Sequence, residues 1–583
     1  VEPYHARIRS ALLHALPQER RVRHHRAIAT ALSGKGTAEQ LARHWYGAGD
    51  VSHAATHARR AGDEARAKLD FDLSARWYAI ALEGAQWTDD ERRALRTQLG
   101  DALADAGHPR EAADQFLAAA GGADASTALE LRRRASGSLL QSGYIAEGLE
   151  LTRAVLAAVG VKLPKTPLRA LVSMLLRRAW LRIRGIGFKP RQISEFSQAE
   201  LTRVDVCEGV SFGLALVDTF RSMDFGTRFL AFALKLGEPW RIARALALET
   251  DLLCAMAKGD RAMRTLARLE DITKTVDKPE AATQLTTTKA FVEFFVTNQF
   301  RTASDLFTEA IDRHRATVNR AGFELDTVLM FWCWTLYYQG QLGDLARRVP
   351  AMAEAAVRAG NRYTAVTLRC AFPIAWLARL EPDAIEAELD AALTSWGMPD
   401  GTYQMQHLFA MCSRIDLALY RGRPDDVTAR IPGELKAVRR VMLDKAPMQG
   451  MLLYSSLARH ALARAATAPT SSRRALIDEA RRHVRTYRKL PVPLAGYSAR
   501  MFDGLIAQHE GDTATAIACY RECLPKLESC DTHLFANAVR ARLGELVGGD
   551  EGRDLVAIAR TWLESEGVRN PEAVLQMLVP GPH

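Results

Sequence analysis

The chain has 583 residues, of which 48% are apolar and 25% charged, and its formal net charge is +10. This length exceeds what one hydrophobic core usually organises, so we expect several domains or a repeat array. Ala, Leu, Arg and Glu dominate most windows, which predicts an all-α protein, and the positive charge is spread too evenly to favour nucleic acid as a partner.

Residues 1–46 precede the first clear repeat and read as a helical lead-in. The chain starts at Val1 within a helical pattern, so we expect a natural N-terminus upstream. The stretch Gly34-Lys35-Gly36-Thr37 hints at a phosphate-binding loop. It lacks the first glycine of that motif and has Gly36 where Ser or Thr should ligate magnesium. We therefore predict an ordinary turn between helices.

Residues 47–160 contain helix pairs of the tetratricopeptide type. Leu99 and Gly100 lie on a first helix, and Gly107 marks the turn to a second. The next turn falls at Gly143, 36 residues later, close to the roughly 34-residue period of these repeats. The second-helix signature, small and bulky residues at i, i+4 and i+7, is Ala112, Phe116 and Ala119.

Gly-Asp dipeptides recur at the predicted turns. Glycine adopts the left-handed conformation that ends a helix, and aspartate caps the helix that follows. The three dipeptides are Gly49-Asp50, Gly259-Asp260 and Gly511-Asp512.

Residues 161–200 interrupt the repeats and contain a basic amphipathic helix. We expect this helix to pack on the repeats through its apolar stripe and to leave its arginines in water. Binding to a membrane surface, a partner protein or nucleic acid is the less favoured interpretation. The stripe comprises Leu168, Leu171, Val172, Leu175, Leu176, Ala179 and Ile183, and the candidate partner-binding residues are Arg177, Arg178, Trp180, Arg182 and Arg184.

Residues 201–464 form looser repeats, with turns near Gly259, Gly340 and Gly422. Asp224-Phe225-Gly226 spells a kinase tripeptide, but no glycine-rich loop or catalytic loop accompanies it, so we treat it as chance. An aromatic cluster before Gly340 is expected in the core, with a ligand platform as the alternative. It consists of Phe331, Trp332, Trp334, Tyr337 and Tyr338.

Residues 465–583 form the C-terminal repeats and cap, with a surface loop predicted at 465–475. Gly504, Gly511, Ala516 and Tyr520 carry the repeat signature. Cys519 and Cys523 lie one helical turn apart, but they fall inside a helix and are expected as core thiols rather than metal ligands. No catalytic, cofactor-binding or metal-binding residue is predicted.

Several stretches resemble known signalling proteins. Residues 4–32, 38–65 and 69–82 resemble the end of the ATPase module of STAND-type ATPases. Residues 221–249, 336–369 and 564–581 look like the C-terminal region of large bacterial serine/threonine protein kinases with a central AAA/STAND ATPase. Relatives with a cyclase or transcriptional effector share similar tails. The resemblance implies ATP and magnesium only for domains upstream of this chain.

The predicted molecule is an all-α, tetratricopeptide-like solenoid forming a right-handed superhelix, which binds and regulates rather than catalyses. Its partners would be a protein or peptide on the concave surface, together with upstream ATPase and kinase domains in cis. Neither nucleic acid nor a membrane is expected as a partner. No signal peptide is visible and no apolar run reaches the roughly 18 residues of a membrane span, so a cytoplasmic location is expected. A stand-alone adaptor remains an alternative.

Overall fold

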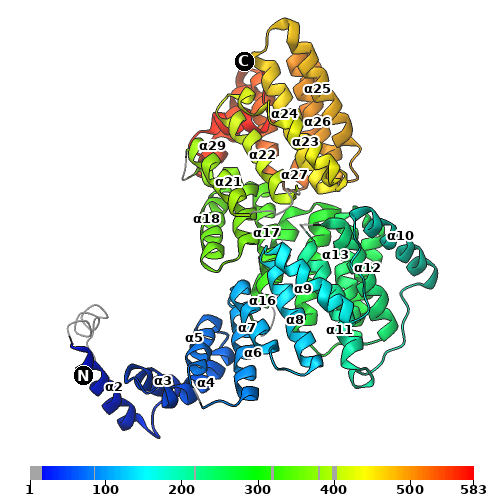
Figure 1. Ribbon diagram of the computed structural model, residues 1–583. Coiled ribbons are helices and arrows are strands. Elements are labelled where there is room, and N and C mark those ends of the chain that lie inside the picture. The colour runs from blue at the N-terminus through cyan, green and yellow to red at the C-terminus, as the bar shows by residue number, and fades with distance from the viewer. Residues whose placement is uncertain are drawn as a thin grey trace. The chain divides into compact units, whose positions relative to one another are not determined.

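The computed structural model describes residues 16–84, 86–215, 218–316, 321–378, 381–396 and 403–582. Within these ranges helix follows helix through short turns and no strand occurs (Figure 1). Neighbouring helices pack against each other in pairs. The all-α helical-repeat solenoid is therefore confirmed, whereas the tetratricopeptide type and the right-handed superhelix stay predictions. Of the predicted lead-in, residues 1–15 lie outside the described residues.

The chain divides into two compact units. Unit 1 comprises Val1–Val161 and Val318–Phe323, and unit 2 comprises Lys162–Thr317 and Glu324–His583. The helices of unit 1 are α2 (Gln18–Leu32), α3 (Ala38–Gly47), α4 (Val51–Ala67), α5 (Phe71–Leu82), α6 (Asp89–Asp105), α7 (Pro109–Ala120), α8 (Ala125–Gln141) and α9 (Ile145–Ala158).

Unit 2 contains the longer series of helices. Its first half consists of α10 (Pro167–Arg184), η1 (Ile193–Glu195), α11 (Gln198–Leu214), α12 (Thr219–Leu236), α13 (Pro239–Ala255), α14 (Gly259–Thr273), α15 (Pro279–Val292), η2 (Glu293–Thr297), α16 (Phe300–Ala316), α17 (Ala321–Gln339, in this unit from Glu324) and α18 (Leu342–Arg358). Its second half consists of α19 (Arg362–Ala371), α20 (Pro373–Leu377), α21 (Pro382–Trp396), α22 (Met405–Tyr420), η3 (Pro424–Val427), α23 (Ile431–Arg440), η4 (Leu443–Lys445), α24 (Pro447–Thr467), α25 (Thr470–Arg488), α26 (Pro493–Glu510), α27 (Thr513–Ser529), α28 (His533–Val547), α29 (Gly549–Ser565) and α30 (Pro571–Leu578).

The helix pairs are closed by a glycine that faces an aromatic ring. A Cβ atom on Gly100 would lie 2.6 Å from Cε1 of Phe116, so only glycine lets the two helices approach this closely. In the pair of α15 and α16 the corresponding place is taken by Phe291, whose ring packs edge-on against Phe307 at 5.4 Å. The glycine–ring pairs, each 16 residues apart, are Gly62–Tyr78, Gly100–Phe116 and Gly504–Tyr520.

Polar contacts between successive helix pairs recur at a nearly constant spacing. The Asp72 carboxylate lies 3.3 Å from the ring of His108, 36 residues later. Arg110 donates to Glu147 at 2.6 Å, 37 residues later. In unit 2, Arg421 donates to a carboxylate 35 residues earlier. This spacing is close to one helix-pair repeat, so the period predicted from weak sequence patterns is present in the contacts.

Unit 2 also makes contacts that an ideal solenoid lacks, because there each repeat touches only its neighbours. The Leu494 amide donates to the Asn298 side chain at 2.9 Å, 196 residues away in sequence. The Gly343 amide donates to Glu566 at 3.1 Å, 223 residues away. The C-terminal helices of unit 2 therefore close on the segment from η2 to α18 in addition to stacking on their neighbours.

The C-terminal end of the described chain is held inside unit 2 by buried side chains. The helix α30 contributes Val574, Leu575 and Leu578 to the core. Three buried side chains donate to backbone carbonyls at and just beyond its end: Arg459 to Met577 at 2.8 Å, Arg542 to Val579 at 2.8 Å and His509 to Pro580 at 2.9 Å.

One predicted turn is built differently. Gly49 and Gly511 are left-handed, and the aspartates that follow them cap α4 and α27, as predicted. Gly259 instead begins α14, and the left-handed residue is Ala257, with φ 51°. A Cβ atom on Gly259 would lie 2.8 Å from Cγ1 of Val296. This glycine therefore permits close packing and does not end a helix.

The predicted surface loop at 465–475 is wrong. The helix α24 continues to Thr467 and α25 begins at Thr470, so only Ala468 and Pro469 separate them. Serine and threonine in the first turn of a helix can hydrogen-bond to nearby backbone. The Ser472 hydroxyl does so, donating to the Pro469 carbonyl at 3.2 Å. The polar stretch is thus a helix start.

Candidate interaction surfaces

The basic helix α10 packs on unit 2 through small and flexible residues. Ala170, Met174 and Leu181 are buried along one face, and this face lies against α12. The cap at its start is the Thr166 side chain, which accepts a hydrogen bond from the Arg169 amide at 3.3 Å. Its C-terminal cap, Gly185, has φ 75°. Figure 1 shows α10 at the outer edge of unit 2.

The arginines of α10 divide between the two faces. Arg178 reaches Glu249 of α13 with two hydrogen bonds, at 2.8 and 3.0 Å, and both side chains are largely buried. Arg177 lies 3.5 Å from the buried Asp224 carboxylate. Arg184 donates to the carbonyls of its own C-terminal turn and lies over the Trp180 ring at 5.6 Å. Of the five candidate residues, only Arg182, Arg184 and Trp180 are exposed.

The expected orientation of α10 is therefore wrong. The apolar stripe points away from unit 2, whereas Arg178 points toward it and Arg177 reaches the buried Asp224 from the edge of the outward face. Ile183 is 88% exposed, Leu176 69% and Leu168 66%. The physical reason lies in α12 and α13, whose buried carboxylates Asp224 and Glu249 pair with the two arginines. Without those pairs, burying the arginines would be costly.

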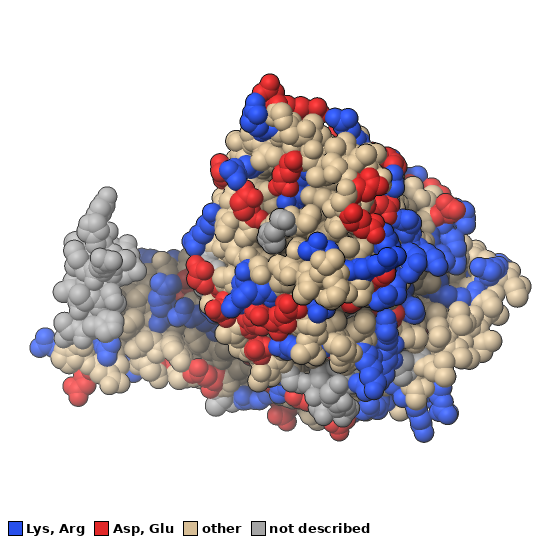
Figure 2. Space-filling view, turned by 90° about the horizontal axis from the view of Figure 1, so that it is seen from above, with Lys and Arg blue, Asp and Glu red and all other residues tan. Residues whose placement is uncertain are grey.

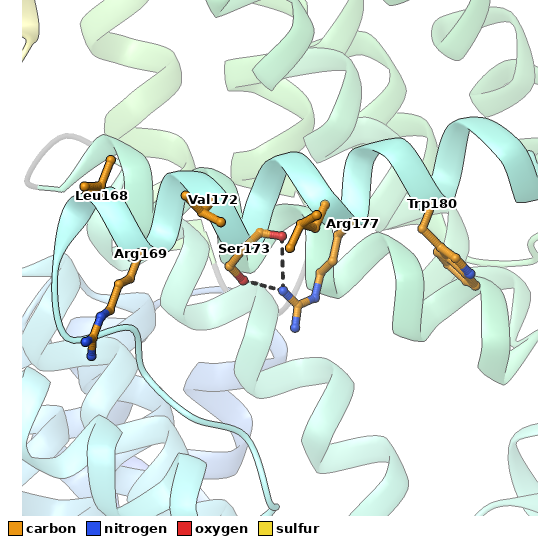
Figure 3. Close-up of a pocket in the computed structure, with 7 residues that line it drawn as sticks. Leu168, Arg169, Val172, Ser173, Arg177 and Trp180 are labelled. Carbon is orange, nitrogen blue, oxygen red and sulfur yellow. Dashed lines mark hydrogen bonds between the residues drawn. The ribbon is translucent and has the colours of Figure 1, made fainter.

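The outward face of α10 is a shallow depression with one wall. The residues around it all belong to α10, as Figure 3 shows for the labelled side chains. Arg177 is held along the helix by hydrogen bonds to Ser173, while Trp180 projects farther along. No second element encloses the depression. The lining residues are Leu168, Arg169, Val172, Ser173, Leu176, Arg177 and Trp180.

The sequence around α10 is strongly basic. Residues 162–191 contain nine Lys and Arg residues and no Asp or Glu. Over much of the face drawn in Figure 2, acidic and basic side chains are interspersed. The same face also has one band in which Lys and Arg predominate. The seven exposed basic residues of this segment are Lys162, Lys165, Arg169, Arg182, Arg184, Lys189 and Arg191.

The kinase-like tripeptide lies inside α12, so Asp224 has a structural role. The Ser173 hydroxyl donates to its carboxylate at 2.7 Å, and Arg228 donates at 2.8 Å. Asp224 and Arg228 are both buried. The aspartate therefore joins α10 to α12.

Unit 1 carries a groove that the sequence analysis did not identify. It has a volume of about 410 Å³ and lies where α5, α6 and α7 meet. Leu99, Leu103 and Ala75 form an apolar floor. The rim is polar and more acidic than basic, with Asp72, Arg76, His108, Glu111, Asp114 and Gln115. The signal that could have identified it is the 36-residue spacing of Asp72 and His108, which bridges two repeats.

The aromatic cluster of α17 packs against neighbouring helices, with Tyr338 buried and its other four members half-buried. The Tyr338 ring stacks on Phe300 at 4.5 Å, and the Trp334 ring lies 4.7 Å from Phe372. Burial raises the pKa of Tyr338 well above its usual value. The cavity beside Tyr337 and Tyr338 measures about 40 Å³, room for about one water molecule. The alternative reading as a ligand platform is not supported.

Neither the cysteines of α27 with its C-terminal cap Cys530 nor His53 of α4 takes part in a group that could hold a metal ion, within the described ranges. Cys519, Cys523 and Cys530 are buried free thiols, and burial raises the pKa of each. His53 lies beside its helix cap Asp50, with its Nδ1 2.9 Å from a carboxylate oxygen. Within the described ranges no group of three or more His, Cys, Asp or Glu side chains is placed to hold a metal ion.

Three further buried groups have strongly shifted pKa values. Burial raises the pKa of Asp251 to about 8 and that of Asp326 to about 6. The side chains of Asn361 and Thr364 both donate to Asp326, so this carboxylate fixes Asn361, whose side chain caps the start of α19. Burial lowers the pKa of His314 to about 4. These groups lie in the packing between helices and do not converge on one cleft.

Comparison with known proteins adds little. No family model matches the chain, and no curated protein is similar to it. One solved structure, described as a circular tandem repeat protein with novel repeat topology and enhanced subunit contact surfaces, is 14% identical and covers 96% of this chain and 97% of its own. Its TM-score is 0.12, so this likeness carries no argument. Among the described helices, none combines the length and apolarity needed to cross a bilayer.

Proposed function

We propose that this chain is a regulatory, protein-binding repeat region, the sensor or scaffold tail of a bacterial serine/threonine kinase with a STAND ATPase. The helical-repeat fold fits a region that binds other polypeptides. The assignment to a kinase rests on the resemblance of residues 221–249, 336–369 and 564–581 to such tails. The groove of unit 1 is the observation that carries the binding role.

The groove has the chemistry of a polypeptide-binding site. Its floor of Ala75, Leu99 and Leu103 accepts an apolar side chain, while polar groups surround it. The exposed carboxylates Glu111 and Asp114 favour a partner that brings a basic residue. We therefore expect the occupant to be a segment with an apolar anchor beside Lys or Arg.

Regulation would follow if the occupant binds one state of the signalling protein better than the other. A ligand shifts such an equilibrium only by its differential affinity for the two states. The tail would then bias the ATPase between its inactive and active states. In this proposal neither ATP nor magnesium binds within the chain.

The test uses the full-length protein that contains this chain. ATP hydrolysis and protein phosphorylation are measured for the wild type, for a Glu111→Lys/Asp114→Lys variant and for Glu150→Lys, an exposed substitution on α9 outside the groove. We expect the double variant alone to change the basal or stimulated rate. Unchanged rates in all three proteins would reject regulation through the groove. An upstream cyclase or DNA-binding domain in place of a kinase would reject the kinase assignment.

A further inference from the structure

The outer face of α10 holds an unusual share of the exposed apolar surface. Of the 13 large apolar side chains that are exposed among the described residues, six lie on this one helix of 18 residues. They recur at helical spacing and form a continuous stripe: Leu168, Val172, Leu175, Leu176, Trp180 and Ile183. A contiguous exposed apolar stripe on a stably packed helix indicates a surface that binds another macromolecule or a membrane.

The charged residues around the stripe indicate which kind of partner would bind it. Nine basic and no acidic residues occur in residues 162–191, and seven of the nine are exposed. Arg177 and Arg178 are already paired with Asp224 and Glu249. The exposed basic residues of the helix itself, Arg169, Arg182 and Arg184, flank the apolar stripe at helical spacing. The surface is therefore complementary to something both anionic and apolar.

The shape of the face favours a flat occupant. All the residues that line its depression come from α10, so there is no second wall to grip a partner helix. A second copy of the chain is disfavoured, because pairing the two faces would oppose like charges. A helix of 18 residues is about 27 Å long and lies with its whole stripe outward.

We propose that α10 binds the surface of an anionic phospholipid bilayer. The apolar stripe enters the boundary between headgroups and acyl chains, as interfacial amphipathic helices do. Trp180 lies at the level of the headgroups, where indole rings are favoured. Arg169, Arg182 and Lys165 meet the lipid phosphates. The inward face stays packed on α12, so the repeat region is held at the membrane without spanning it.

The experiment is flotation of the full chain with vesicles of phosphatidylcholine alone or mixed with phosphatidylglycerol. The wild type is expected to float with the mixed vesicles and to be released when salt rises from about 0.1 M to about 1 M, because the Debye length shortens from about 10 Å to about 3 Å. Absence of flotation with the mixed vesicles would overturn the proposal. Equal flotation with phosphatidylcholine alone would overturn the role of the basic residues.

Two double variants distinguish binding through α10 from non-specific binding of exposed apolar residues to vesicles. Leu176→Glu/Ile183→Glu places two charges on the stripe and is expected to weaken vesicle binding about tenfold or more. The matched control is Val357→Glu/Ile558→Glu, at exposed positions on α18 and α29. The control is expected to bind like the wild type, and thermal unfolding checks that both variants fold. Equal loss in both variants, or none in the α10 variant, would contradict the proposal.

A second measurement distinguishes lipid from protein as the occupant. Sedimentation of the chain without lipid reports whether it self-associates. A dimer that the α10 variant disperses would assign the stripe to a second copy and overturn the lipid proposal. The result depends on neither an effector domain nor the groove of unit 1, so it stands or falls separately from the proposed function.

Discussion

Glycines within these helices serve packing in some positions and have no visible packing role in others. In α6, Gly100 lets the Phe116 ring lie against the backbone of its partner helix. In α8, a Cβ atom on Gly137 would meet nothing within 4 Å. Both residues are in helix interiors of unit 1, so their substitution separates the cost of crowding from the intrinsic cost of glycine in a helix.

Gly100→Ala is expected to lower the free energy of unfolding by about 1–3 kcal/mol, because its new methyl group overlaps the Phe116 ring. Gly137→Ala is expected to leave it unchanged or to raise it by up to about 1 kcal/mol. Urea unfolding followed by circular dichroism measures both. Equal effects of the two substitutions would show that the ring contact does not limit the approach of the helices.

His314 makes stability depend on pH. Burial lowers its pKa from 6.5 to about 4, and its Nε2 lies 3.3 Å from the Thr287 hydroxyl. Well above pH 6.5 the histidine is neutral in both states and contributes no pH dependence. As the pH falls from 6.5 toward 4, the unfolded chain binds a proton that the folded chain does not, so stability falls by up to about 1.4 kcal/mol per pH unit.

His314→Leu is expected to reduce the pH dependence of the unfolding free energy by the equivalent of up to one bound proton. The measurement is urea unfolding at several pH values between about 7 and about 5. The exposed His24→Leu serves as the control and is expected to keep the wild-type slope. A variant at position 314 that loses stability as steeply as the wild type would refute the assignment.

Residues whose role depends on local sequence were predictable, and those whose role depends on distant partners were not. The caps after Gly49 and Gly511 follow from neighbouring residues, because a cap bonds within its own turn. The packing role of Gly259 depends on Val296, which comes 37 residues later. No local pattern marks such a contact.

At the scale of single elements, α10 shows how an amphipathic pattern leaves orientation open. Both faces of this helix are apolar, since Ala170, Met174 and Leu181 oppose the longer stripe. Which face packs inward depends on Glu249, because its carboxylate pairs with Arg178, which lies 71 residues earlier in the chain. The sequence predicted the helix and its basic character, but it could not show which face is buried. The unit 1 groove was missed because its walls come from three separate helices.

Arg178→Ala is expected to destabilise unit 2 by about 3 kcal/mol, because it leaves the buried Glu249 carboxylate without its main partner. The loss stays at the low end because Arg261 lies 4.0 Å from the same carboxylate. Arg182→Ala, on the exposed side of the same helix, is expected to change stability by less than about 0.5 kcal/mol. Thermal or urea unfolding compares the two. Similar losses would show that α10 is not anchored through Glu249.

At the scale of the whole molecule, unit 2 combines stacking of successive helix pairs with contacts between segments far apart in the sequence. Its C-terminal helices contact the segment from η2 to α18, and its last carbonyls are bound by Arg459, Arg542 and His509. The repeat period predicted the helix pairs, because the two helices of a pair lie within about one repeat of each other in the sequence. It did not predict the contacts between the C-terminal helices and the segment from η2 to α18, since residues about 200 positions apart produce no periodic sequence pattern.

Deleting residues 571–583 is expected to destabilise unit 2 by several kcal/mol. It uncovers the core that α30 covers and removes the backbone carbonyls to which Arg459, Arg542 and His509 donate. Limited proteolysis should then cut unit 2 sooner and leave unit 1 as resistant as before. Unchanged protection of unit 2 would show that the C-terminal end is dispensable.

The closure of unit 2 sets an order of events during synthesis. Helix pairs of unit 1 find their partners within about 40 residues, so they can mature while the ribosome is still translating. The residues of η2 to α18 must wait until Leu494 and Glu566 emerge, roughly 10 to 50 seconds later at ordinary elongation rates. During that interval the Tyr337 and Tyr338 side of α17, which packs against Phe535 of α28 in the folded chain, is uncovered, and nascent-chain chaperones would bind there.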